Sequence, residues 1–521
     1  MKKNRYWNLT FRPSRPDLIL MHPPSIYRFR EQPVFSGPVS DVIPSSSLFE
    51  IYPIGFLTIS EYLLRHGISV RIVNLAMKMI LDESFDPEKF IAKLHPIAFG
   101  IDLHWLPHAD GSLSLARAVK KLHPDTPVIF GGLSATYYYR EILEDYPFVD
   151  FVVRGDSTEE PLRRLMEAVK AGRGYESVPN LAWRDKNGNI IVNPLSHHPF
   201  NLDNLNFDYS HLLKMTIKYF DPSGYIPFQN WLSNPVTAVF SCRGCLHNCA
   251  SCGGSVAGFK NVCMREKASF RSPELVAKDM KNISRYTGAP IMLIGDLLQA
   301  GEDYAVRFLE AINQYRIRNE IAIEFFNPPP EEFIERVAGA IQNFNIEISP
   351  ESHDPRVRKA FGKSYTNADL ERAIGAFIRN GCRRVDLFFM VGLPYQDYQS
   401  VMDTVRYCEE LLMKFGGYGR LLPMISPLAP FIDPGSSIFE DPERFGYKIF
   451  YRTLREHREA MLMPSWKYTL NYETAWMTRS EIVNATYESA LMLNDIKKKY
   501  GVVKPSVAER IKSHIRKAQT L

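Results

Sequence analysis

Two long stretches of the chain alternate short strand-like runs with helical runs, and this alternation limits the possible folds more than any other feature. In the first stretch, residues 16–170, the strand-like runs end in loops rich in Gly, Pro, Ser or Asp. Such alternation is typical of an open, doubly wound parallel sheet, which binds ligands outside the carboxyl ends of its strands. Strands are predicted at 17–24, 70–75, 96–102, 126–132 and 148–156, and helices at 55–66, 112–123 and 159–170.

The same alternation returns at Pro235 and continues for about 190 residues, where the spacing fits roughly six βα units. This pattern predicts a full or partial βα barrel, whose active site would lie at the carboxyl ends of the strands. The clearest strand-like runs are TAVFS, APIMLIGD, IAIEFF, FNIEISPES and RRVDLFFMVGLP.

The remaining segments complete a predicted α/β fold class with four parts. Residues 171–234 form a connector, in which Asn187-Gly188 between two alternating runs predicts a β-hairpin. Residues 431–521 have mostly helical periodicity and are expected to form a C-terminal extension on the substrate side. The predicted division is therefore a Rossmann-like domain (1–170), the connector (171–234), a partial TIM barrel (235–430) and the extension (431–521).

Composition limits the classes of function. A length of 521 residues predicts about three domains, and 45% hydrophobic with 23% charged residues is ordinary for a folded protein. A formal charge of +5 gives no electrostatic argument for nucleic acid. No run approaches the roughly 18 apolar residues of a membrane span, and the first residues predict no signal peptide, so a cytoplasmic location is expected.

The cysteines indicate a metal site. Of seven, none precedes Cys242 and five fall within residues 242–263. Clustering in one loop favours metal ligation over disulfides. Cys245, Cys249 and Cys252 have the spacing C-x3-C-x2-C. Three thiolates on a short loop can bind three irons of a cubane cluster and leave the fourth iron open to substrate.

Two other interpretations of this loop remain. Cys242 could join the other three in a zinc site, although zinc ribbons usually separate their cysteine pairs by a dozen or more residues. Cys242 could instead complete a fully ligated electron-transfer cluster. The isolated Cys263, Cys382 and Cys408 are expected to be buried, unreactive thiols.

The cysteine loop, placed after a strand at the start of a βα barrel, resembles the signature of the radical S-adenosylmethionine (SAM) superfamily over about residues 235–430. The resemblance implies a [4Fe–4S] cluster whose free iron binds SAM and whose electron cleaves it to a 5′-deoxyadenosyl radical. The resemblance also implies that several residues at later strand ends contact SAM, although they match the family more loosely. Ordinary strand-end turns and caps are the alternative interpretation of these residues. These expected SAM contacts are Gly295, Asp296, Ser349, Glu351 and Gly392.

The first domain resembles the cobalamin-binding domain of cobalamin-dependent radical SAM enzymes, and the resemblance then covers about residues 16–430. No G-x-G-x-x-G or G-x4-G-K-[ST] motif supports a nucleotide instead. Glycines would let the backbone approach a flat ligand, and hydroxyls could donate to its amide arms. The expected cobalamin contacts are Pro23, His104, Trp105, Gly131, Gly132, Ser134, Gly155 and Asp156.

One departure from the cobalamin pattern concerns the lower face of cobalt. The segment Asp102–Pro107 lacks the final Gly of the D-x-H-x-x-G motif and follows the third strand. His104 is therefore expected near this face without being assigned as a ligand, and a satisfied loop histidine is the alternative.

Together these resemblances imply a cobalamin-dependent radical SAM C-methyltransferase that acts on an unactivated carbon, with an electron donor such as ferredoxin or flavodoxin. The substrate could be a peptide or protein residue, such as glutamine of methyl-coenzyme M reductase. Alternatives are cyclisation, ring contraction or oxygen insertion on a small molecule or lipid, and a non-enzymatic cobalamin or redox sensor. Pro-rich MISPLAPFIDPGS could line the cavity, and Tyr468, Tyr472, Glu473, Trp476 and Arg479 could meet substrate or simply cap the barrel.

Overall fold

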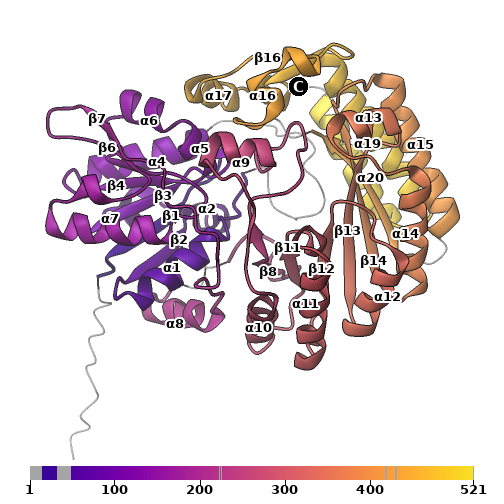
Figure 1. The fold of residues 1–521 in the computed structure, drawn as a ribbon. Coiled ribbons are helices and arrows are strands. Elements are labelled where there is room, and N and C mark those ends of the chain that lie inside the picture. Colours follow the sequence, from indigo (N-terminus) through magenta and orange to yellow (C-terminus); the bar gives the residue numbers. More distant parts are fainter. Residues whose placement is uncertain are drawn as a thin grey trace, which may run out of the picture.

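The computed structural model describes residues 15–31, 48–221, 223, 226–416, 419–428 and 431–519. Two sheets lie side by side, and the C-terminal segment passes across one end of both (Figure 1). The expectation of no signal peptide rests on residues 1–24, of which 1–14 lie outside the described residues. Ala429 and Pro430 of the MISPLAPFIDPGS segment also lie outside them. Among described residues, no helix is both long and apolar enough to cross a membrane.

The first sheet has the strand order β2-β1-β3-β4-β5-β6-β7, in which β1 to β5 are parallel. Its strands are β1 Leu18–His22, β2 Val70–Asn74, β3 Ala98–Asp102, β4 Val128–Gly131, β5 Phe151–Val153, β6 Leu181–Arg184 and β7 Ile190–Val192. The order reverses between β1 and β3, which is where ligands bind in doubly wound sheets. The hairpin predicted at Asn187-Gly188 is present, and it pairs antiparallel with β5 and extends this sheet.

Helices cover both faces of the first sheet and bury a separate hydrophobic core on each face. Sequence-local signals set their ends: Asn74 and Asp86 cap α2 and α3, and Gly172 ends α7 in the left-handed conformation. The helices are α1 Gly55–Arg65, α2 Leu75–Leu81, α3 Pro87–Ile91, η1 Leu106–His108, α4 Ala109–Leu122, α5 Leu133–Tyr137, α6 Tyr139–Asp145, α7 Glu159–Ala171 and η2 Tyr175–Ser177. Helix α8 (Tyr209–Tyr219) follows in the connector.

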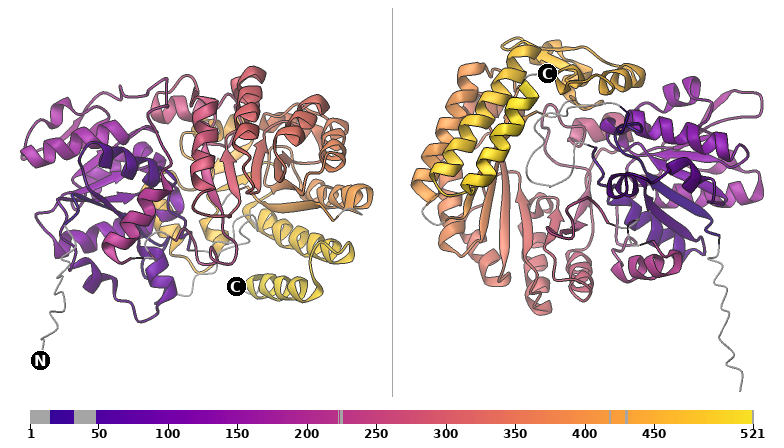
Figure 2. Two further views of the ribbon diagram at one scale, coloured as in Figure 1. Left: turned by 90° about the horizontal axis from the view of Figure 1, so that it is seen from below. Right: turned by 180° about the vertical axis from the view of Figure 1, so that it is seen from behind.

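The second sheet is an all-parallel, partial barrel with the order β8-β11-β12-β13-β14-β15. Its strands are β8 Thr237–Phe240, β11 Ile291–Ile294, β12 Ile321–Phe325, β13 Phe344–Glu351, β14 Arg384–Val391 and β15 Leu421–Pro427. Helices cover its outer face (Figure 2). They are α10 Pro273–Ile283, η4 Leu297–Ala300, α11 Glu302–Tyr315, α12 Glu331–Ala340, α13 Pro355–Phe361, α14 Asn367–Arg379 and α15 Tyr398–Phe415.

The predicted fold class, an α/β chain with two parallel sheets and a helical C-terminal part, is confirmed. The C-terminal part comprises α16 Ser437–Glu440, η6 Glu443–Phe445, β16 Tyr447–Ile449, α17 Leu454–Met461, α18 Trp466–Thr469, β17 Tyr472–Thr474, α19 Arg479–Lys499 and α20 Pro505–Gln519. Helix α17 packs on α4, and α19 packs on α15 and β15. The C-terminal part therefore ties the two sheets together.

Candidate functional site

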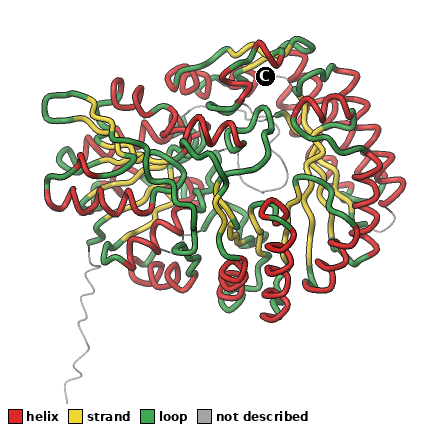
Figure 3. The backbone as a smooth tube through the Cα atoms, in the orientation of Figure 1, coloured by secondary structure: helices red, strands yellow, loops and turns green. Residues whose placement is uncertain are grey.

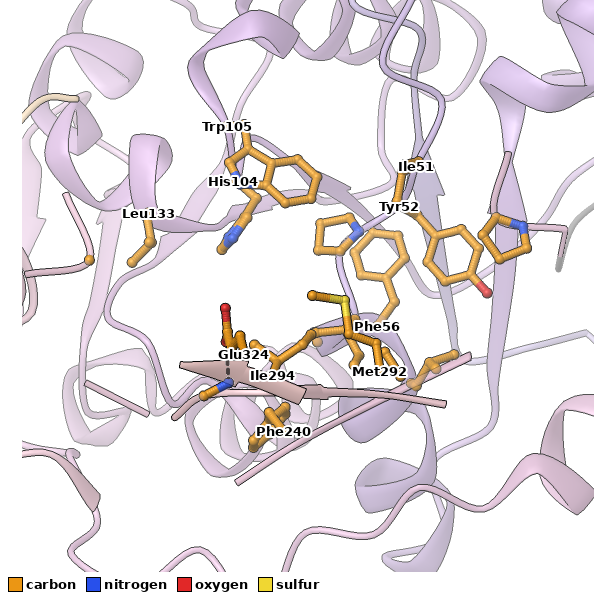
Figure 4. Close-up of a pocket in the computed structure, with 18 of the residues that line it drawn as sticks. Ile51, Tyr52, Phe56, His104, Trp105, Leu133, Phe240, Met292, Ile294 and Glu324 are labelled. Atoms are coloured by element: carbon orange, nitrogen blue, oxygen red, sulfur yellow. Dashed lines mark hydrogen bonds between the residues drawn. The ribbon is translucent and has the colours of Figure 1, made fainter. Parts of the chain in front are cut away.

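A cavity of about 1550 Å³ lies between the two sheets, and loops from the carboxyl ends of both sheets line it. Figure 3 shows how much of the chain between the sheets is loop. In Figure 4, His104 and Trp105 project from one wall towards Glu324, Ile294 and Met292 on the opposite wall. The structure brings twelve of the predicted site residues to this cavity: Cys245, Cys249, Cys252, Gly295, Ser349, Glu351, His104, Trp105, Gly131, Gly132, Gly155 and Asp156.

The cysteine loop follows the short strand β9 (Cys242–Arg243), which pairs with β10 (Ser269–Phe270), and it leads into helix α9 (Val256–Cys263). Backbone N–H groups donate to two of its sulfurs: His247 N to Cys245 Sγ at 3.4 Å and Gly254 N to Cys252 Sγ at 3.3 Å. Burial raises the pKa of the Cys245 thiol to about 11 and also raises the pKa of the Cys252 thiol. A bound metal would reverse this by stabilising the thiolates.

These thiols fit an iron–sulfur cluster by donor type and by surroundings. Thiolates are the ligands that such clusters use, and hydrogen bonds to sulfur help to set their potential. Among the described residues, no three His, Cys, Asp or Glu side chains form a group that could hold a single metal ion. Cys242 also lines the cavity, with its sulfur packed beside Gly295, where an added Cβ would lie 3.0 Å from it.

A buried ion pair lies next to the cysteine loop on the barrel side. Lys363 Nζ contacts Glu351 Oε1 at 2.7 Å and donates to the Ser349 carbonyl at 2.5 Å. Burial acts to lower the pKa of Lys363, but the Glu351 carboxylate outweighs it and raises that pKa, so the ammonium stays charged. Glu351 Oε2 is buried and has no hydrogen-bond partner among described residues, which leaves an acceptor at the cavity wall.

Asp296 and Gly392, two of the expected SAM contacts, do not line the cavity. Asp296 caps η4 by accepting from Leu298 N and also accepts from Phe326 N, as a strand-end turn residue does. Gly392 has φ +95°, and an added Cβ would lie 2.5 Å from the hydroxyl of Tyr472. In the structure Asp296 therefore serves as a cap and Gly392 as a packing contact, and their expected contacts with SAM stay predictions.

On the first sheet, the loop after β4 presses against the loop after β3. Gly132 has φ 115° and ψ 170°, a conformation essentially restricted to glycine, and a Cβ there would lie 2.4 Å from His104 Cα. Ser134 N and Oγ both donate to the His104 carbonyl at 3.2 Å. Burial lowers the pKa of His104 to about 4, so its ring is neutral at neutral pH. Trp105 is 42% exposed.

Behind His104, a polar network occupies the switch point of the first sheet. His22 Nδ1 lies 2.9 Å from Asp102 Oδ1, and ring nitrogens of His22 and His108 share the Phe49 carbonyl. Burial acts to raise the pKa of Asp102, but His22 outweighs it and holds that pKa below its usual value. The Asp102 carboxylate is therefore paired with the His22 ring.

Pro23 and Ser134, two of the expected cobalamin contacts, do not line the cavity. Pro23 is buried against Gly111 of α4, where an added Cβ would lie 3.2 Å from the Pro23 ring. The Ser134 hydroxyl donates to the His104 carbonyl instead.

Two buried ion pairs join the first sheet to the barrel. Arg265 Nε donates to Asp156 Oδ2 at 2.6 Å, and both side chains are almost fully buried. Arg243, next to Cys242, donates to both carboxylate oxygens of Glu159 at 2.5 and 2.8 Å. These pairs fix the two walls of the cavity relative to each other.

Several cavity residues were not predicted. Tyr52 and Phe56 stack with ring centroids 6.1 Å apart and line one side (Figure 4), although the Tyr-Pro-Ile-Gly-Phe segment carries only a helix-start signal. The MISPLAPFIDPGS segment lines the cavity as expected, through Met424, Leu428, Phe431 and Asp433. The other C-terminal candidates, Tyr468, Tyr472, Glu473, Trp476 and Arg479, do not line it, and their observed surroundings fit a barrel cap.

Comparison with known families agrees with this arrangement. Residues 41–164 match the B12 binding domain and residues 239–408 match the Radical SAM superfamily. The chain is 22% identical over 468 residues to cytidylyl-2-hydroxyethylphosphonate methyltransferase from Streptomyces wedmorensis, covering 78% of this chain and 84% of that protein.

Solved structures share the fold over nearly the whole chain. TsrM from Kitasatospora setae, a radical S-adenosylmethionine methyltransferase with bound cobalamin and [4Fe-4S] cluster, has a TM-score of 0.62 and 14% identity, covering 97% of this chain and 99% of that one. The cobalamin-dependent S-adenosylmethionine radical enzyme OxsB, with aqua-cobalamin and S-adenosylmethionine bound, has a TM-score of 0.59 and 13% identity, covering 97% and 71%.

Proposed function

The chain belongs to the cobalamin-dependent radical SAM methyltransferases, and we propose from this premise that it methylates an unactivated carbon of a substrate held between its two sheets. Its cofactors are cobalamin, a [4Fe–4S] cluster and SAM. The observation that carries the proposal is that the cysteine loop and the glycine-rich edge of the first sheet line the same cavity. We also propose the domain boundaries at residues 170, 234 and 430, with the hairpin of the connector packed onto the first sheet.

We assign the cluster to Cys245, Cys249 and Cys252. SAM then lies beside Gly295, Ser349 and Glu351. Cobalamin lies against His104, Trp105, Gly131, Gly132, Gly155 and Asp156, all of which border the cavity. A volume of 1550 Å³ supports this assignment, because it exceeds the roughly 300–1,000 Å³ of a pocket for one drug-sized ligand.

The three groups, when bound, supply a 5′-deoxyadenosyl radical and a methyl group. The chain's own task is alignment and exclusion of water. The ion pairs Arg265–Asp156 and Arg243–Glu159 hold the walls in register. Apolar side chains such as Phe240, Met292 and Phe431 line part of the space between the walls and leave less room there for water. Lys363 keeps the Glu351 carboxylate paired at the edge of the cysteine loop.

The substrate class is the finer part of the proposal. The name of cytidylyl-2-hydroxyethylphosphonate methyltransferase describes a small-molecule substrate, and a small molecule fits a cavity that also holds the cluster, SAM and cobalamin. The narrower expectation of a peptide or protein residue, such as glutamine of methyl-coenzyme M reductase, stays a prediction. So does reduction of the cluster by a ferredoxin or flavodoxin.

Product analysis tests the proposed function. The reconstituted protein is incubated with reductant, methylcobalamin, SAM labelled in its methyl group and candidate substrates. We expect 5′-deoxyadenosine together with labelled methyl in one product. Deoxyadenosine with an unmethylated, rearranged or oxidised product would indicate one of the alternative reactions, and absence of deoxyadenosine would contradict the proposal.

A further inference from the structure

Three carboxylates form a row across the interior of the barrel. Glu324 lies near the carboxyl end of β12, where it accepts from Gly295 N, and Glu347 and Asp386 lie deeper, on β13 and β14. Glu324 of β12 lies opposite Glu347 of β13 in the strand register, and Glu347 lies opposite Asp386 of β14. All three carboxylates line the cavity. Glu347 precedes Ser349 by two residues, so it lies about 7 Å further from the carboxyl end of the strand.

The row contains acceptors that the protein leaves unused. Asn345, one inward position deeper on β13 and only 4% exposed, donates its amide to Glu320 but has no partner for Oδ1 among described residues. Asp386 is 1% exposed, and its Oδ1 also lacks a partner there. Because a buried acceptor without a donor is costly, these atoms indicate that a donor from a ligand completes the site.

Nearby cations do not balance the row. Arg384 pairs with Asp386 at 2.7 Å but is about half exposed, and the charge of Lys497 on α19 also acts to lower the pKa of Asp386. Lys363 is committed to Glu351. Burial and repulsion from Asp386 and Glu324 raise the pKa of Glu347 to about 7. A positive group with N–H donors would satisfy the acceptors and relieve the repulsion together.

We propose that the row of Glu324, Glu347 and Asp386, with Asn345, binds a cationic nitrogen group of the substrate, such as an amine, amidine or guanidine. This inference rests on the proposed function, because it places the substrate in the same cavity as the cofactors. The cation anchors one end of the substrate inside the barrel, and the carbon to be methylated then lies nearer the strand ends.

Binding of two matched probes tests the proposal. Butylguanidinium and the neutral, similarly shaped N-butylurea are titrated by calorimetry into protein holding its cluster and cobalamin. We expect butylguanidinium to bind roughly tenfold or more tightly, as charge-assisted hydrogen bonds imply. Glu347→Gln should remove most of this preference, whereas Glu335→Gln on the exposed face of α12 should keep it.

The pH dependence supplies a second measurement. Glu347 gains its charge as pH rises through about 7, so the preference for the cation should grow over this interval in the wild type and stay flat in Glu347→Gln. The titratable groups facing Glu347 are Glu324 and Asp386, with Arg384 beside Asp386. Equal binding of the two probes to the wild type would overturn the inference, as would an unchanged preference in Glu347→Gln.

These outcomes are separable from those of the proposed function. A protein that forms deoxyadenosine and methylated product but binds both probes equally retains the function and loses the inference. A protein that prefers butylguanidinium but never cleaves SAM retains the cation site and loses the function.

Discussion

Alanine at Cys245, Cys249 or Cys252 is expected to yield protein that lacks the brown colour of an iron–sulfur cluster and forms no 5′-deoxyadenosine. Each of these thiols borders the cavity, and each would supply one of three bonds to the cluster. Two remaining thiols cannot replace the missing bond, so SAM cleavage should fall to the level of protein without iron. Iron and sulfide content, visible absorbance and deoxyadenosine formation are the measurements.

Two other cysteines provide the controls for this prediction. Cys242→Ala should keep cluster and SAM cleavage if the trio alone binds the cluster, although its sulfur also lines the cavity. Cys408→Ala should keep both, because Cys408 lies buried in α15, as expected for an isolated thiol. Loss of the cluster in Cys242→Ala with retention in any of the trio variants would contradict the assignment.

Gly132→Ala is expected to abolish retention of cobalamin while the cluster remains. The φ and ψ of Gly132 lie in a region that costs other residues about 1–3 kcal/mol. The added Cβ would also lie within 2.7 Å of three backbone atoms of Leu103 and His104, which must move. This displaces the His104–Trp105 wall of the cavity, and the bound corrinoid measured after desalting should fall accordingly.

Gly172→Ala is the matched control, because Gly172 also has a positive φ but no atom within 4 Å of an added Cβ. It should cost only about 1–2 kcal/mol of stability and keep cobalamin. Gly155→Ala offers a milder change at the cavity edge, where the Cβ would meet the side chains of Asn180 at 3.2 Å and Leu195 at 3.7 Å. Normal cobalamin retention by folded Gly132→Ala would contradict the assigned wall.

The features that the sequence predicted well depend on neighbouring residues along the chain. Strand–helix alternation and the spacing of Cys245, Cys249 and Cys252 are local patterns, so the sheets and the cysteine loop could be located without the structure. A further local pattern lies within β13 itself. Asn345, Glu347 and Ser349 occupy every second position of β13, which in a buried barrel strand indicates a polar inner face.

Features that depend on contacts between distant segments could not be predicted. Gly392 stands at a strand end, as a cofactor contact would, but Tyr472 from the C-terminal part packs against it. The pairing of the hairpin with β5 is likewise a contact between separate segments, and the sequence pattern of a strand does not show which strand it pairs with. The ion pair of Arg265 with Asp156 spans 109 positions of the sequence.

The EPR spectrum of protein that holds both the reduced cluster and cob(II)alamin shows whether the two centres border one cavity. We expect each signal to be broadened, or to relax faster than in protein holding that centre alone, because two paramagnetic centres facing one cavity interact magnetically. Two signals identical to those of the singly loaded proteins would contradict this expectation.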